Sequence, residues 1–208
     1  MIRVLIADDH AVVRHGVKQI LQDTREMVVA GEAVNGQEVL EKVRAGAWDV
    51  LILDISMPGY NGLDILKELE RVRPDLPVLV LSMHPEDQFA MRALKAGASG
   101  YLTKDSAPDE LVKAIHKVVS GGKYVSPSLA EKLAYGQGVD KLPHETLSDR
   151  EFQVLRLIAA GKSVKEIAVE LALSVKTIST YRVRLLQKMN LATTAELIRY
   201  AIQRHLVD

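Results

Sequence analysis

Four short apolar runs in the first half of the chain each end in a polar side chain suited to binding a cation or a phosphate. The runs are residues 4–7 before Asp8 and Asp9, 50–53 before Asp54, 78–81 before Ser82, and 101–102 before Thr103 and Lys104. Runs this short and this rich in β-branched residues are typical of strands buried on both faces of a parallel sheet. Ligands of open α/β sheets bind at the carboxyl ends of the strands. We therefore expect three carboxylates, a hydroxyl and an ammonium group to meet at one edge of the sheet.

Helical patterns and one more strand fill the gaps between these runs. Apolar residues recur at helical spacing after Asp9, a further strand is expected over residues 28–30, and Asn61 is well placed to cap a helix. The alternation predicts a doubly wound α/β domain of flavodoxin-like fold, with five parallel strands, over residues 1–122. Its later helices are expected over residues 37–45, 62–72 and 86–96, and from Pro108 to a stop at Gly121 and Gly122.

The pattern changes after residue 122. Residues 123–146 hold two prolines and two glycines with little periodicity and are expected to form a linker, in which residues 128–135 can form a short helix. Residues 147–208 are predicted to be an all-α domain of four helices, over about 148–160, 164–172, 175–189 and 193–206. The short gap between the second and third helices predicts a helix-turn-helix. Helix starts are marked by three capping boxes: Ser148 with Glu151, Ser163 with Glu166, and Thr193 with Glu196.

Composition narrows the chemistry and the partners. The chain has no cysteine, which excludes disulfides, thiolate zinc sites and thiol catalysis. It has no apolar stretch of the ~20 residues that span a membrane, so no membrane partner is expected and a cytoplasmic location is the default. Residues 1–122 carry 14 Lys and Arg against 18 Asp and Glu, whereas residues 123–208 carry 13 against 9. A basic second half makes nucleic acid a candidate partner for it.

The acidic residues at the sheet edge suit Mg²⁺ or Mn²⁺, which take oxygen ligands and keep several waters. Asp9 and Asp54 can bind the ion directly, and Asp8 can hold a coordinated water. With a metal offsetting the repulsion among carboxylates, Asp54 can act as a nucleophile and form an acyl phosphate. Lys104 would balance the new charge, and the Ser82 hydroxyl would donate to a phosphoryl oxygen.

The first 122 residues resemble the receiver domain of two-component response regulators, in particular the NarL/FixJ branch. The resemblance rests on Asp8, Asp9, His10, Val13, Arg14 and Gly16, on residues 54–58 with Gly62, and on Ser82, Tyr101 and Lys104. It implies that Asp54 accepts a phosphoryl group from a sensor histidine kinase and that the backbone carbonyl of Ser56 completes the metal site. It also implies that Ser82 and Tyr101 form a conformational switch. Many receivers have proline after the lysine, but Asp105 follows Lys104 here, which leaves the geometry of that peptide bond open.

The third helix of the second domain has the charge of a DNA-reading helix. Residues 174–195 contain no acidic residue, and this segment is the second helix of the predicted helix-turn-helix. Such a helix enters the major groove of double-stranded DNA, where side chains reach bases and phosphates. Arg182 is expected to pack its stem against the core, and Lys165 and Lys188 are expected to contact phosphates. The candidate DNA-binding residues are Lys165, Lys176, Thr177, Ser179, Thr180, Tyr181, Arg182, Val183, Arg184, Gln187 and Lys188.

Residues 147–197 resemble a LuxR-type DNA-binding domain over almost their whole length. Leu147 to Glu151, Gly161, residues 165–168, Ser174, Thr177, Ile178, Lys188 and Met189 carry the resemblance. Val164 and Tyr181 depart from the common asparagine and histidine, and the Tyr181 hydroxyl can still donate to a phosphate.

Together these features predict a DNA-binding transcription regulator activated by phosphorylation of Asp54, and not an enzyme beyond promoting its own phosphorylation and dephosphorylation. A homodimer is expected when the protein is phosphorylated, through the receiver domain, the last helix or both. The last helix offers an apolar stripe for such a contact: Ala195, Leu197, Ile198, Ala201 and Ile202. One alternative is a regulator that binds DNA without phosphorylation. A less favoured one is an aspartyl-phosphate phosphotransferase or phosphatase, which would leave the helix-turn-helix unexplained.

Overall fold

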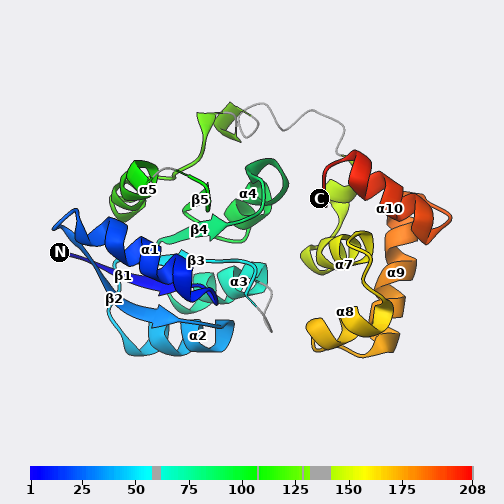
Figure 1. The fold of residues 1–208 in the computed structure, drawn as a ribbon, viewed down its shortest axis with the longest axis horizontal. Coiled ribbons are helices and arrows are strands. Elements are labelled where there is room, and N and C mark those ends of the chain that lie inside the picture. The colour runs from blue at the N-terminus through cyan, green and yellow to red at the C-terminus, as the bar shows by residue number, and fades with distance from the viewer. Residues whose placement is uncertain (58–61, 107, 128, 132–141, 208) are drawn as a thin grey trace. The chain divides into compact units, whose positions relative to one another are not determined.

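The structure is a computed structural model that describes residues 1–57, 62–106, 108–127, 129–131 and 142–207. The chain forms two compact units, Met1–Gln137 and Gly138–Asp208 (Figure 1). No cis peptide bond occurs among the described residues, so the bond between Lys104 and Asp105 is trans. No helix in the described ranges is long and apolar enough to cross a membrane.

The first unit is built on a five-stranded parallel sheet, as predicted. Its strands are β1 (Ile2–Ala7), β2 (Met27–Ala33), β3 (Val50–Leu53), β4 (Val78–Ser82) and β5 (Gly100–Thr103), in the order β2-β1-β3-β4-β5. Helices α1 (Ala11–Gln22) and α5 (Pro108–Val119) contact one another, and α2 (Gly36–Ala45), α3 (Gly62–Val72) and α4 (Glu86–Lys95) contact in series (Figure 1). β3 and β4 are buried along their whole length, because helices cover both faces of a parallel sheet.

One glycine lets the chain pass close behind the acidic residues. A Cβ atom on Gly62 would lie 2.3 Å from the Cα atom of Ile55, which is closer than any side chain tolerates. The first turn of α3 can therefore pack directly against the loop that follows Asp54. The predicted cap of this helix, Asn61, lies outside the described residues.

Both ends of the predicted linker pack into the neighbouring units. Tyr124 donates its backbone N–H to Ser99 and accepts from Tyr101, which extends the first unit beyond the predicted boundary at residue 122. Residues Pro143–Thr146 form a 3-10 helix that belongs to the second unit. Most of the short helix expected over residues 128–135 lies outside the described residues.

The second unit contains the four expected helices: α7 (Asp149–Ala159), α8 (Val164–Glu170), α9 (Val175–Met189) and α10 (Thr194–Gln203). All three predicted capping boxes form, and the hydroxyl of Ser174 caps α9. Gly161 adopts the left-handed conformation expected after α7, with φ 81°. The apolar spacing in residues 175–189 predicts that Val175 faces the core, but Val175 is 47% exposed. The first residue of α9 lies beyond the end of the buried stripe formed by Ile178, Leu185 and Met189.

Candidate functional site

Backbone hydrogen bonds set the ends of the central strands level with one another. The N–H of Asp54 donates to the carbonyl of Ala7 at 2.8 Å, and the N–H of Lys104 donates to the carbonyl of Ser82 at 2.8 Å. The residues that follow β1, β3 and β5 therefore project from one edge of the sheet. This is the arrangement that the order of apolar runs predicts.

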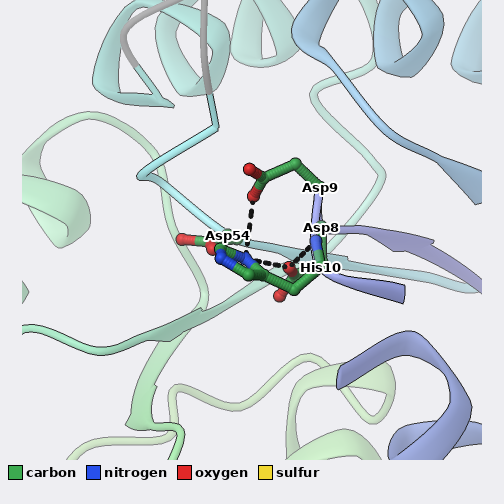
Figure 2. Close-up of side chains that lie close together, drawn as sticks. All are labelled: Asp8, Asp9, His10 and Asp54. Atoms are coloured by element: carbon green, nitrogen blue, oxygen red, sulfur yellow. Dashed lines mark hydrogen bonds and ion pairs between the residues drawn. The ribbon is translucent and has the colours of Figure 1, made fainter. Parts of the chain in front are cut away.

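The acidic side chains meet at this edge (Figure 2). One ligand atom from each of Asp8, Asp9, His10 and Asp54 lies within 4.8 Å of the others. Asp8 and Asp54 are buried, with 2% and 1% exposure, whereas Asp9 is exposed. Residues 9 and 54 are close enough for their carboxylates to share a single cation, as expected.

Lys104 connects the two buried carboxylates. Its ammonium Nζ lies 2.5 Å from Oδ2 of Asp54 and 2.6 Å from Oδ2 of Asp8. Burial raises the pKa of Asp54, and the charge of Asp8 adds to this, against the opposing hydrogen bonds from Lys104 and the backbone N–H of Ser56. In the absence of a cation the site thus holds more negative charge than Lys104 offsets.

The donor set fits Mg²⁺, because three carboxylates converge and one of them is exposed to solvent, where the ion can keep its waters. Asp9 and Asp54 are the residues that would hold the ion, with Asp8 beside them. Ser56 donates its N–H to Oδ1 of Asp54 at 2.8 Å, which fixes the loop that carries the carbonyl assigned to the metal.

His10 was not among the predicted site residues, yet its ring lies over the acidic pair. Its Nδ1 is 3.2 Å from Oδ1 of Asp8 and 3.0 Å from Oδ1 of Asp9 (Figure 2). Its backbone N–H also donates to Asp8 at 2.8 Å. The position of His10 directly after two aspartates at a strand end was the signal available in the sequence.

The predicted switch residues converge on the loop after β4. Ser82 is buried and its Oγ accepts from the N–H of His84 at 3.1 Å, while the Tyr101 hydroxyl donates to the carbonyl of His84 at 2.8 Å. The His84 ring stacks on Phe89 with centroids 4.5 Å apart, and its Nε2 lies 3.1 Å from Oγ of Ser56. One loop residue therefore contacts Ser82, Tyr101 and the segment after Asp54. From the sequence, the position of His84 two residues after Ser82 fits either a role in hydrolysis of the acyl phosphate or an ordinary loop histidine, and it does not predict these contacts.

The predicted DNA-binding residues divide by exposure. Lys165, Lys176, Thr180, Val183, Arg184, Gln187 and Lys188 are exposed, and Thr177, Ser179, Tyr181 and Arg182 are half-buried, as expected for Arg182. Ser179 and Thr180 donate their hydroxyls to backbone carbonyls one turn earlier, which leaves their oxygens able to accept. Thr177 is engaged by the capping residue Ser174.

Lys188 has a partner that the sequence did not predict, and part of the expected dimer stripe is buried. The side chain of Lys188 is 46% exposed, and its ammonium lies 2.7 Å from Oε2 of the buried Glu151. Within the apolar stripe of α10, Leu197 and Ala201 are fully buried in the core of their own unit. A helix buries about one face, so only Ala195, Ile198 and Ile202 remain for a dimer contact.

Comparison with known proteins agrees with both units. Residues 4–116 match the response regulator receiver domain, and residues 145–201 match the luxR family of bacterial regulatory proteins. The chain belongs to the two-component response regulators of the NarL/FixJ subfamily, with a LuxR-type DNA-binding domain. It is a transcription regulator by this architecture.

Relatives among the response regulators cover the whole chain, and two of them serve as examples. The response regulator UvrY of Shigella flexneri is 38% identical over 211 residues, covering 100% of this chain and 97% of UvrY. The response regulator GacA of Pseudomonas viridiflava is 39% identical over 211 residues, covering 100% of this chain and 99% of GacA.

Solved structures show the same fold in both units. RcsB from Salmonella enterica serovar Typhimurium, bound to promoter P1flhDC in the presence of the phosphomimetic BeF3⁻, has a TM-score of 0.72 at 31% identity, covering 96% of this chain and 97% of RcsB. The response regulator ChrA of a heme-sensing two-component system has a TM-score of 0.55 at 29% identity, covering 99% and 98%.

Proposed function

We propose that Asp54 is the phosphoacceptor and that it receives its phosphoryl group from a sensor histidine kinase. The supporting observation is the buried Asp54 carboxylate, placed within reach of Asp8, Asp9 and the Lys104 ammonium. A carboxylate oxygen of Asp54 attacks the phosphorus of the donor, the bond from phosphorus to the donor breaks, and the donor group leaves. Mg²⁺ or Mn²⁺ at Asp9 and Asp54, with the carbonyl of Ser56, would supply positive charge that screens the approach of the anionic donor.

Once the acyl phosphate has formed, Lys104 pairs with the added charge and the Ser82 hydroxyl donates to a phosphoryl oxygen. Ser82 now accepts from the N–H of His84, and the Tyr101 hydroxyl holds the carbonyl of the same residue. Movement of Ser82 toward the phosphate would therefore disturb the loop that Tyr101 holds. This is the route by which we expect phosphorylation to change the domain.

A direct test is the intact mass of the chain after treatment with acetyl phosphate and Mg²⁺. The parent is expected to gain the mass of one phosphoryl group, and Asp54→Asn to gain none. An unmodified parent, under conditions that label a control receiver, would favour the regulator that binds DNA without phosphorylation.

We further propose that α9 reads the major groove of double-stranded DNA. Its exposed face combines small side chains at residues 179, 180 and 183 with the charges of Lys176 and Arg184, and Lys165 of α8 is exposed for a phosphate. The RcsB relative is itself bound to a promoter. A homodimer, with Ala195, Ile198 and Ile202 in contact, would place two copies of α9 in half-sites about one helical turn apart.

Binding-site selection with the full chain, with and without acetyl phosphate, tests the DNA-binding role. The parent is expected to enrich one sequence, and Arg184→Ala to bind the enriched duplex about tenfold more weakly at matched salt while its phosphorylation is unchanged. Equal affinity of Arg184→Ala and the parent would count against the groove assignment.

The protein is proposed to catalyse nothing beyond the formation and hydrolysis of its own acyl phosphate, and to act in the cytoplasm, where kinase and DNA are both available. Sustained turnover of a phosphate ester, lost in Asp54→Asn, would instead support the phosphatase or phosphotransferase alternative.

A further inference from the structure

Glu151 is the one charged side chain that is buried outside the phosphorylation site, within the ranges that the structure describes. It stands in the first turn of α7 and its side chain is 5% exposed. A buried carboxylate is costly unless it is paired and hydrogen-bonded. Its partners therefore show what the fold uses this charge for.

Three donors converge on a single oxygen of Glu151. Oε2 accepts from the N–H of Ser148 at 2.8 Å, from the Ser148 hydroxyl at 2.9 Å and from Nζ of Lys188 at 2.7 Å. Burial raises the pKa of Glu151, but the bonds from Lys188 and Ser148 outweigh this and lower it, so the carboxylate stays charged at neutral pH. The capping box and the ion pair thus share one atom.

The ion pair joins α7 to the helix proposed to read DNA. Lys188 lies in the last turn of α9, between the buried Leu185 and Met189, and is 37 residues from Glu151 along the chain. Among the described residues, Lys188 is the only basic side chain in an ion pair with Glu151, and a phosphate contact by Lys188 would draw its charge away from this buried carboxylate. The two roles of Lys188 therefore compete.

We propose that Lys188 is a positioning residue, which fixes the orientation of α9 against α7 through Glu151 and does not contact the DNA backbone. The assignment rests on the proposed DNA-reading role of α9. It predicts that Glu151, which carries a negative charge and is buried, is needed for tight and selective DNA binding.

The test uses the full chain and the duplex that the parent enriches in the selection experiment, beside a scrambled duplex of equal length. Lys188→Met and Glu151→Gln are each expected to weaken binding to the enriched duplex about tenfold, with little change on the scrambled one. Glutamine keeps the capping box, because its amide oxygen still accepts from Ser148. The double variant is expected to be no weaker than either single one, because both remove the same interaction.

The salt dependence separates this role from a phosphate contact. Loss of one phosphate contact reduces the slope of log affinity against log salt by about 0.9. Lys165→Met, at an exposed lysine, is expected to show that reduction on both duplexes, whereas Lys188→Met is expected to keep the slope of the parent. A reduced slope in Lys188→Met, or unchanged or tighter binding by Glu151→Gln, would overturn the assignment.

Circular dichroism at the assay temperature verifies that each variant is folded. If Glu151→Gln does not fold, the slope of Lys188→Met decides alone, with Lys188→Arg expected to recover affinity because a guanidinium can still pair with Glu151. If the parent enriches no sequence, the DNA-reading function itself falls, and this assignment with it. If instead the parent enriches a sequence and Glu151→Gln binds it as tightly as the parent does, only the positioning role of Lys188 is overturned.

Discussion

At the scale of single residues, burial of the charged Asp54 carboxylate lowers the free energy of unfolding of the first unit. Its pKa is raised by burial, so the folded chain binds more protons than the unfolded chain between the two pKa values of this group. The stability contributed by Asp54 therefore falls as pH rises through that interval, and the cost is greatest above it. Removal of this charge should stabilise the fold where a cation is absent.

Asp54→Asn is accordingly expected to raise the free energy of unfolding by about 1 kcal/mol at pH 7 without divalent cations, a size typical of single substitutions. Urea denaturation of the full chain measures it, and the gain should shrink as the pH is lowered and the native carboxyl of the parent takes up its proton. Asp105→Asn, at an exposed neighbour, is the matched control and should change the free energy by less than about 0.5 kcal/mol. A destabilised Asp54→Asn would show that the pairing with Lys104 outweighs the cost of burial.

At the scale of helices, all four helix ends of the second unit adopt the same motif. Gly161, Ala172, Asn190 and His205 each have φ between 52° and 81°, and the residue after each donates its N–H to the carbonyl five residues earlier. This Schellman motif favours glycine, because a Cβ atom strains the left-handed conformation. Ala172, in the turn of the helix-turn-helix, has neither the freedom of glycine nor the polar side chain of asparagine.

Ala172→Gly is therefore expected to stabilise the second unit by roughly 0.5 kcal/mol, the relief of strain being partly offset by the greater freedom of glycine in the unfolded chain. Gly161→Ala is the mirror-image control: an added Cβ there meets no atom within 4 Å, so only the backbone strain remains and the change should destabilise by a similar amount. Thermal unfolding of the two variants measures both signs. Stabilisation by Gly161→Ala would contradict the account.

The helices also show how far the sequence alone could go. Capping boxes and strand-end aspartates were predicted correctly because each depends on residues close in sequence or on the common edge of a parallel sheet. The ion pair of Lys188 was not predicted, because its partner Glu151 is remote in the chain and had only been expected to form a capping box. The predicted dimer stripe on α10 included two residues, Leu197 and Ala201, that are buried within their own unit. Helical periodicity identifies an apolar face, but it does not show how much of that face the rest of the same domain covers.

At the scale of the whole molecule, each unit has a hydrophobic core of its own. One core cluster joins the strands to α1 and α5 of the first unit, whereas Phe152, Leu155, Ile178 and Leu185 are buried in the second. Separate cores make separate cooperative units, so calorimetry of the full chain is expected to show two transitions. Substitutions in one unit should move only its own transition.

Mg²⁺ provides the sharpest test of that division, because its proposed site lies entirely in the first unit. An ion that binds only the folded site stabilises it by about 2.7 kcal/mol at a hundred times its dissociation constant. Saturating Mg²⁺ should therefore raise the transition that Asp54→Asn also moves, and leave unchanged the transition that Ala172→Gly moves. Asp9→Asn should abolish the shift, because it removes the charge of the exposed carboxylate that is proposed to bind the ion together with Asp54. A shift that persists in Asp9→Asn would place the cation elsewhere, and equal shifts of both transitions would mean that the units unfold as one.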